Sequence, residues 1–332
     1  MKKKITIIAE VGVNHNGSFL LAKKYIRECA KLKIDYVKFQ FAIPELVATK
    51  YVKSAKYQNK NTNNPNQLDL IKKIHLSPNQ YLRLISYANN FNIKILFSFF
   101  DSYSLSTLIK QKVKSIKIPS GEINNFPLLE LLKNYKGKIF LSTGMSSLKE
   151  VEETYNFLIN LNVNPKNICV MQCTSNYPTD FKDLNLNVIN TFINLFGKNV
   201  GFSDHTISTE ATLTAIGLGA IVIEKHITFD QSLDGPDHKA SMNFNDFKLF
   251  ISQIRNIELA FGSYEKKINL SEIKNKELVR KVIVAKSNIN KNEILSFSNL
   301  DIKRAGIGLS PSKIKYLIGK KAKRNYLKDE KL

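Results

Sequence analysis

Short apolar runs alternate with amphipathic stretches from residue 5 to about residue 262. Apolar runs of about four to eight residues with polar boundaries are typical of parallel strands that helices cover on both faces. Eight such runs occur, at residues 5–10, 35–40, 93–98, 115–122, 138–144, 168–174, 199–205 and 221–226. Because helix-like sequence follows each run, the pattern predicts eight strand–helix units.

Capping residues support several of the expected helices, since Ser, Thr, Asp and Asn favour the position just before a helix. They are Ser18 for a helix over 18–31, Ser77 and Pro78 for a helix over 78–91, and the Ser147/Glu150 pair for the helix after the fifth strand. A short amphipathic helix is expected between the third and fourth strands. We interpret the stretch between the second strand and Ser77 as a polar loop.

Eight consecutive units predict a (β/α)8 TIM barrel, in which active-site groups gather where the strands end. Polar residues indeed stand at nearly every predicted strand end, whereas a doubly wound sheet would gather them around one crevice. They are Glu10; Lys38 and Gln40; Ser98; Lys117, Ser120 and Glu122; Ser142; Thr174; Ser203, Asp204 and His205; and Glu224, Lys225 and His226. The active site is therefore expected at this end of the barrel.

Two histidines suggest a metal site. His205 and His226 end the seventh and eighth strands, which are neighbours, and barrel closure brings Glu10 to the same side. Two imidazoles with a carboxylate and open positions suit Mn²⁺ or a similar divalent cation better than a closed structural zinc site. The alternative for either histidine alone is a structural role.

A second polar set predicts an anion pocket. Lys38 and Lys117 supply two ammonium groups, and hydroxyl groups come from Ser98, Ser120, Ser142 and Ser203. Lysine offers charge without demanding a planar partner, and hydroxyl groups satisfy the remaining oxygen lone pairs. The set therefore fits a small dianion that carries phosphate and carboxylate.

Composition excludes several classes of protein. The formal net charge is +22, but the lysines run from Lys2 to Lys331 without an arginine cluster or an aromatic ladder, so we expect no nucleic-acid partner. The apolar stretch after the first lysines ends at Glu10, and no later segment is long enough to span a bilayer. We expect a cytoplasmic protein without a membrane partner.

The cysteines Cys29, Cys169 and Cys173 are odd in number and lack Cys-x-x-Cys spacing. A disulfide framework or a zinc knuckle is therefore not expected, and the three are interpreted as buried reduced thiols. His15 is interpreted as structural, and His75 is expected on the surface of a helix.

Ordered motifs carry a family resemblance. The segments "AEVGVNHNG", "VKFQ", "KIPSGEINNFPLL", "LSTGM", "CTSNYPT", "GFSDHT", "EKHIT" and "GPDHKAS" resemble the sialic acid synthase family, the phosphoenolpyruvate-dependent synthases of N-acetylneuraminate, legionaminate and pseudaminate. The tail segments "VIVAKSNINKNEIL", "LDIKRAGIGLSP" and "IGKKAKRN" resemble its C-terminal antifreeze-like SAF domain. The resemblance implies a barrel over 1–262, a linker over 263–280 and a SAF domain over 281–332.

The resemblance implies condensation of phosphoenolpyruvate with a 2-acetamido sugar to give a nine-carbon 2-keto acid and phosphate. Lys38, Ser98, Lys117, Ser120, Ser142 and Ser203 would hold phosphoenolpyruvate, and His205 and His226 would bind Mn²⁺ or Mg²⁺. Glu10, Gln40, Glu122, Tyr177 and Asp237 would face the sugar. Glu122 is expected to transfer a proton and Glu10 to orient water, although these two roles can be exchanged.

The resemblance also implies a domain-swapped homodimer, in which Arg304 reaches the sugar from the SAF domain of the partner subunit. The sequence is also compatible with two different functions. A SAF module suits a non-catalytic surface-binding protein as well, and pseudaminate synthesis is a second enzymatic activity that the family includes. The motif "GPDHKAS" favours the neuraminate and legionaminate branches but does not choose between N-acetylmannosamine and a 6-deoxy diacetamido sugar.

Overall fold

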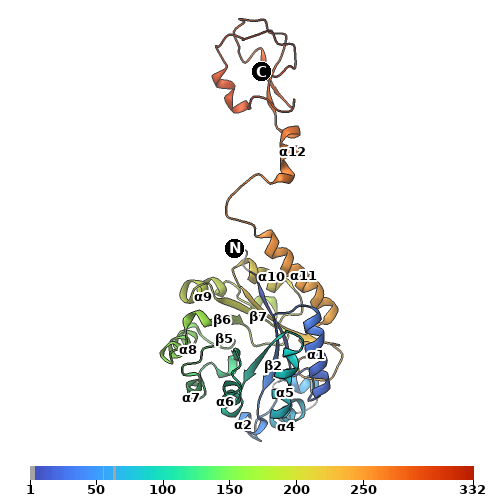
Figure 1. Ribbon diagram of the computed structural model, residues 1–332, viewed down its shortest axis with the longest axis vertical. Coiled ribbons are helices and arrows are strands. Elements are labelled where there is room, and N and C mark those ends of the chain that lie inside the picture. The colour runs from blue at the N-terminus through green and yellow to red at the C-terminus, as the bar shows by residue number, and fades with distance from the viewer. Residues whose placement is uncertain (1–3, 55, 63–64) are drawn as a thin grey trace. The chain divides into compact units, whose positions relative to one another are not determined.

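The first part of the chain is a closed barrel of parallel strands, as Figure 1 shows. The computed structural model describes residues 4–54, 56–62 and 65–332. The barrel strands are β1 (Thr6–Gly12), β2 (Tyr36–Phe41), β3 (Lys94–Phe99), β4 (Ser115–Ile118), β5 (Lys138–Ser142), β6 (Ile168–Cys173), β7 (Val200–Asp204) and β8 (Val222–Thr228). Each pairs in parallel with the next, and β8 pairs with β1. The predicted (β/α)8 barrel is confirmed.

Helices surround the strands (Figure 1). They are α1 (Phe19–Lys31), α2 (Pro44–Val47), α3 (Lys56–Thr62), α4 (Gln67–Ile74), α5 (Pro78–Asn89), α6 (Ser102–Lys110), α7 (Phe126–Leu129), α8 (Leu148–Asn160), α9 (Val188–Phe196), α10 (Glu210–Gly217) and α11 (Phe244–Ala260). The expected caps are present, because Ser18 Oγ accepts from Leu21 N at 3.2 Å and Ser77 and Ser147 close capping boxes. A short β9 (Met242–Asn243) extends the sheet beside β8.

The connection from β2 to α5 differs from the expected polar loop, because it contains α2, α3 and α4. Asn66 caps α4 by accepting from Asp69 N at 3.2 Å. Leu70 and Ile74 on this helix are buried and pack with Val13. The prediction was wrong because the asparagine- and lysine-rich composition ahead of α4 obscured a short apolar helix face.

Two layers of side chains fill the barrel interior. The lower layer is an apolar cluster that includes Ile8, Tyr36, Leu96, Phe140, Met171 and Val222. Since side chains on one face of a strand recur every second residue, the next inward residues are Glu10, Lys38, Ser98, Ser142, Cys173 and Glu224. The apolar layer therefore closes the barrel beneath a polar mouth.

The second compact unit covers Ser263–Leu332. It contains α12 (Leu270–Val279), which has no buried side chain, and the antiparallel pair β10 (Val282–Ala285) and β11 (Leu300–Lys303). A small apolar core packs around this pair. The segment expected as a linker thus includes a helix with no core of its own.

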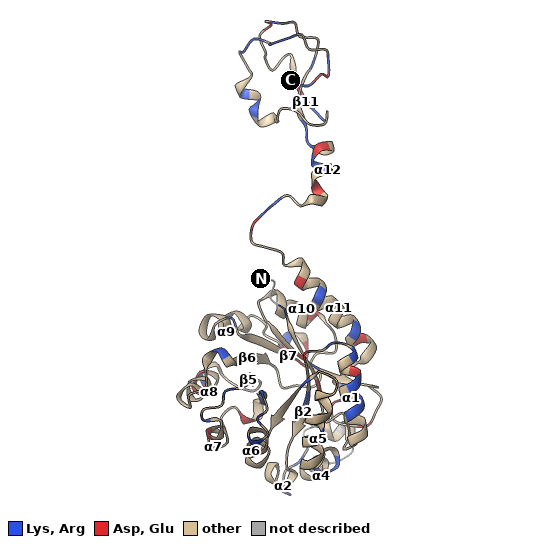
Figure 2. Ribbon diagram, in the orientation of Figure 1, with Lys and Arg blue, Asp and Glu red and all other residues tan. Residues whose placement is uncertain are grey.

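Figure 2 shows Lys and Arg on α1, α8, α11 and the second unit, with Asp and Glu among them. This distribution agrees with the scattered charge that the sequence indicated. In the parts of the chain that the structure describes, no helix has both the length and the apolar character to cross a membrane. Cys29, Cys169 and Cys173 are buried and reduced, as expected.

Candidate active site

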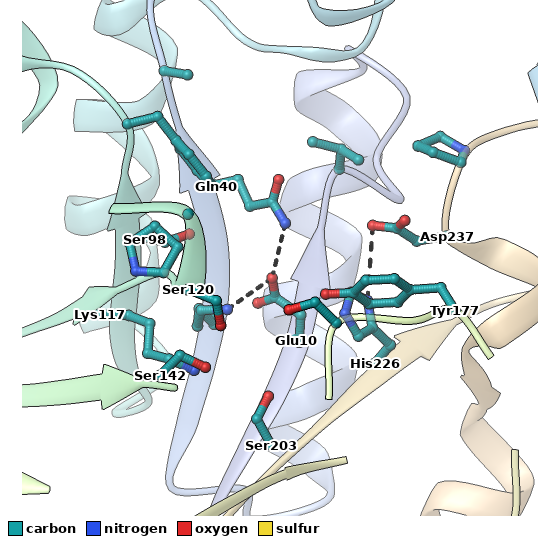
Figure 3. A pocket seen from close by; sticks show the side chains of 18 of the residues that line it. Glu10, Gln40, Ser98, Lys117, Ser120, Ser142, Tyr177, Ser203, His226 and Asp237 are labelled. Carbon is teal, nitrogen blue, oxygen red and sulfur yellow. Dashed lines mark hydrogen bonds and ion pairs between the residues drawn. The ribbon is translucent and has the colours of Figure 1, made fainter. Parts of the chain in front are cut away.

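A cavity of about 440 Å³ opens where the barrel strands end (Figure 3). Every predicted site residue of the barrel except Glu122 lines it: Glu10, Lys38, Gln40, Ser98, Lys117, Ser120, Ser142, Tyr177, Ser203, His205, His226 and Asp237. Glu122 lies next to the lining residues Ser120 and Gly121, but its carboxylate accepts a hydrogen bond from Asn125 at 2.7 Å. Arg304 lies in the second unit, directly after β11.

The end of β8 places Glu224, Lys225 and His226 on alternating faces. Glu224 and His226 line the cavity, whereas Lys225 points to the opposite face of the strand. There Lys225 Nζ lies 2.9 Å from Asp204 Oδ2 and 2.8 Å from the Thr206 carbonyl oxygen. This fully buried ion pair joins the ends of β7 and β8, the strands that carry the two histidines.

Glu224 is the electrostatic centre of the anion pocket. Lys117 Nζ lies 2.8 Å from its carboxylate, Lys38 Nζ lies 3.1 Å away, and Ser203 Oγ donates to it at 3.1 Å. Although burial favours the neutral form, Lys117 and Lys38 hold the pKa of Glu224 well below its ordinary value. Sequence reasoning gave Glu224 no role, yet its position two residues before His226 already placed it on the inner face.

Glu10 occupies a different electrostatic environment. Glu10 pairs with Lys38, as Glu224 does, and its Oε1 lies 2.8 Å from Lys38 Nζ. Gln40 Nε2 also donates a hydrogen bond to Glu10 Oε1 at 3.3 Å. Burial raises the pKa of Glu10 above its ordinary value, and the charge of Lys38 offsets this only in part. Among the described residues, Glu10 Oε2 has no hydrogen-bond partner. Glu10 is therefore the carboxylate of this pair that takes up a proton more readily.

His205 and His226 form the imidazole pair that a cation would need, with ring centroids 5.5 Å apart. His205 Nδ1 lies 2.7 Å from the Thr174 carbonyl oxygen, which can only accept, so Nδ1 carries a proton. Although burial disfavours the charged ring, Cys173 and the Thr174 carbonyl raise the pKa of His205 above its ordinary value. Burial, His205 and Lys38 lower the pKa of His226, so its ring is neutral. Its Nδ1 hydrogen-bonds to no described residue and lies 3.9 Å from Asp237 Oδ2.

These donors fit a divalent cation. Neutral imidazole is a good ligand for such ions, and catalytic sites keep positions open for substrate or water. Across residues 4–54, 56–62 and 65–332, no three His, Cys, Asp or Glu side chains already converge as a ligand set. The protein would thus supply the two imidazoles, and additional ligands would complete the coordination.

His15 and His75 differ from each other. His15 is fully buried beside Phe39 and Tyr81, in agreement with a structural role. The expectation that His75 lies on the surface is wrong, because α4 turns it into the cavity lining. Sequence reasoning missed it because the helix before it was interpreted as a loop.

We expect His15 to make stability fall in mild acid. Burial and the nearby His75 lower the pKa of His15 to about 3, below its ordinary value of 6.5. The unfolded chain therefore binds the proton first, so stability is lost as pH falls below about 6.5. Thermal denaturation between pH 7 and pH 4.5 should show a smaller decrease in Tm for His15→Gln than for the wild type. An identical decrease in both proteins would contradict this account.

The fold and the cavity define a barrel enzyme whose cavity brings two lysines and a pair of imidazoles together. The chain belongs to the NeuB family, whose model matches residues 25–266, and a SAF domain matches residues 280–331.

Similar proteins cover nearly the whole chain. It is 43% identical to the N,N'-diacetyllegionaminic acid synthase of Campylobacter jejuni, over 99% of this chain and 98% of the relative. It is 37% identical to the enzyme of that name from Legionella pneumophila, over 96% and 90% of the two chains. A solved structure of N-acetylneuraminic acid synthetase from Leptospira borgpetersenii, in complex with citrate, is 28% identical to this chain. The match covers 83% of this chain and 91% of that chain, with a TM-score of 0.73.

Proposed function

We propose that the protein condenses phosphoenolpyruvate with a 6-deoxy diacetamido sugar and water to give N,N'-diacetyllegionaminate and phosphate. The observation that carries the proposal is the convergence of Lys38, Lys117 and Ser203 on one carboxylate, that of Glu224. Two ammonium groups and a hydroxyl at one point are the donors that an anionic substrate requires. The two legionaminic acid synthases among the relatives supply the choice of sugar.

Phosphoenolpyruvate would lie across the inner ring of strand ends. Lys38 and Lys117 would contact its charged groups, and Ser98, Ser142 and Ser203 would complete the hydrogen bonds around them. Ser98 Oγ is buried without a described partner, so a substrate oxygen could use it. Ser120 Oγ accepts from Gly144 N at 3.0 Å and fixes the turn after β5 beside this pocket.

His205 and His226 would hold a divalent cation, Mn²⁺ or Mg²⁺, and Asp237 would face the same side of the cavity, since its Oδ2 lies 3.9 Å from His226 Nδ1. The cation would supply Lewis acidity toward the aldehyde oxygen of the open-chain sugar. Tyr177 stacks near His205, with ring centroids 4.1 Å apart, and would shield this side of the cavity from water.

The remaining chemistry belongs to the side chains. C3 of phosphoenolpyruvate forms a bond to the sugar aldehyde carbon, water adds at C2, and the C2–O bond to phosphate then breaks. Glu10 is our choice for the group that moves a proton, because it lines the cavity and burial favours its protonated form. Glu122 faces Asn125 and would act on the sugar only after a side-chain movement.

The proposed assembly is a domain-swapped homodimer. Tyr264, Leu270 and Leu278, in the segment before β10, are exposed apolar side chains, and α12 has no buried residue. Exposed apolar surface of this kind favours burial against a partner. Arg304 is also exposed and forms no ion pair with a described carboxylate, so it is available to a second chain.

The function is tested by measuring phosphate release from phosphoenolpyruvate with the 6-deoxy diacetamido sugar and with N-acetylmannosamine, each in the presence of Mn²⁺. Mass spectrometry of the product identifies the acid formed. We expect faster turnover of the diacetamido sugar. Phosphate release that does not require a sugar, or none with either sugar, would contradict the proposal.

We expect Lys117→Met to weaken phosphoenolpyruvate binding selectively. A lost contact between an ammonium group and an anion costs about 1.5–3 kcal/mol, or about ten- to a hundredfold in the KM for phosphoenolpyruvate. The KM for the sugar should change much less. Lys133→Met, at an exposed lysine outside the cavity, is the matched control. Equal increases in both KM values would refute the assignment.

A further inference from the structure

The β2–α5 connection forms one wall of the cavity. Val47 ends α2, and Gln67, Ile71 and Ile74 belong to α4, which His75 follows; all of them line the cavity. The wall is tied to the loop after β8, because Asn61 Nδ2 on α3 donates to the Pro236 carbonyl oxygen at 3.0 Å. None of these residues belongs to the predicted anion pocket or metal site.

Gln67 carries a hydrogen-bond acceptor that lacks a donor. Its backbone N donates to the Val52 carbonyl oxygen at 3.1 Å, which fixes the first turn of α4. Its side-chain Oε1 is shielded from solvent, and no described residue donates to it. A buried acceptor without a donor is unfavourable, so a ligand N–H that reached this amide would relieve the cost.

His75 presents a second acceptor. Its Nδ1 lies 3.1 Å from the Ile71 carbonyl oxygen, which can only accept, so Nδ1 carries the proton. Burial lowers the pKa of His75 to about 4, although Asp101 opposes the shift. The ring is therefore neutral near pH 7, and Nε2 is an acceptor on the wall of the cavity.

Apolar side chains line the same cavity as these two acceptors. They are Val13, Ala42, Val47, Ile71, Ile74 and Phe100. An acceptor within an apolar surface suits an acetamido group, which has one N–H donor and a methyl group. It suits a hydroxyl group less well, because a hydroxyl group brings no methyl group to bury.

We propose that Gln67 Oε1 or His75 Nε2 accepts a hydrogen bond from the N–H of the acetamido group that N-acetylmannosamine lacks, and that the apolar wall takes up methyl groups. The 6-deoxy diacetamido sugar has an additional acetamido group and a methyl group where N-acetylmannosamine has a hydroxyl group and a hydroxymethyl group. The wall therefore selects the diacetamido sugar. This inference rests on the proposed function and assigns its sugar specificity to the β2–α5 connection.

The test compares kcat/KM for the two sugars at saturating phosphoenolpyruvate, using the full-length chain. Where Gln67 is the acceptor, Gln67→Leu should lower kcat/KM for the diacetamido sugar by about tenfold and for N-acetylmannosamine by clearly less, so that the ratio between the sugars falls. Where His75 is the acceptor, His75→Phe, which keeps a ring without Nε2, should lower the ratio in the same way. The KM for phosphoenolpyruvate should change little in both variants.

Gln111→Leu is the matched control, since Gln111 is an exposed residue that caps α6 away from the cavity. Melting temperatures of all variants exclude misfolding as the cause of a lower rate. Gln67→Glu retains an acceptor of the same size and, where Gln67 is the acceptor, should keep more of the preference than Gln67→Leu. An unchanged ratio in both Gln67→Leu and His75→Phe would overturn the inference while leaving the function standing. A wild-type protein that uses neither sugar would overturn the function itself.

Discussion

His226→Ala should abolish turnover that depends on a divalent cation while leaving the barrel folded. His226 contributes a neutral, buried imidazole whose Nδ1 has no hydrogen-bond partner among the described residues. Lewis-acid stabilisation is worth several kcal/mol, and each 1.36 kcal/mol is tenfold in rate, so we expect a loss of about a thousandfold or more. The measurement is phosphate release after chelation and stepwise re-addition of Mn²⁺.

Binding of Mn²⁺ to the purified variant should be measured separately, because an activity assay alone does not distinguish loss of the metal from other damage to the active site. His238→Gln is the matched control. His238 is buried and its Nδ1 lies 2.7 Å from Thr228 Oγ1, but it does not line the cavity. If His226→Ala bound Mn²⁺ as the wild type does, or regained substantial activity with added Mn²⁺, the metal assignment would fail.

Mixing Arg304→Ala chains with His205→Ala chains should restore activity that neither variant has alone. In the proposed swapped dimer, each active site takes His205 from one chain and Arg304 from the other. A mixed dimer therefore has one intact site and one doubly defective site. With random exchange at equal amounts, about a quarter of wild-type activity should return.

Subunit exchange must be verified, for example with two affinity tags purified in sequence. Mixing His205→Ala with His226→Ala is the control, because both defects lie in the same barrel and no mixed dimer should gain an intact site. The absence of recovery in verified mixed dimers of the first pair would rule out a shared active site.

The barrel and the lining of its cavity could be predicted because both follow from local patterns. An apolar strand that ends in polar residues marks the barrel mouth, and the two-residue period of a strand selects the side chains that point inward. This logic placed Lys38, Lys117, His205 and His226 around one cavity. The same period also identifies Glu224, once it is applied to every residue of β8.

The rest of the site depends on contacts between distant segments. The pairing of Glu224 with both Lys38 and Lys117 joins β2, β4 and β8, and no local pattern reveals it. His75 and Gln67 were missed because a polar composition concealed α4, whose few apolar residues become informative only when Val13 packs against them. The orientation of Glu122 likewise depends on Asn125, its neighbour in the folded turn.

The alternation of Glu224, Lys225 and His226 also limits where the chain can gain or lose residues. A single insertion or deletion early in β8 would exchange the two faces of the strand end, turning Lys225 into the cavity and removing Glu224 and His226 from it. Residues 231–234, beyond the strand, are exposed and lie outside the cavity lining. A library of one-residue insertions should therefore yield active clones at residues 231–234 and inactive ones at the start of β8.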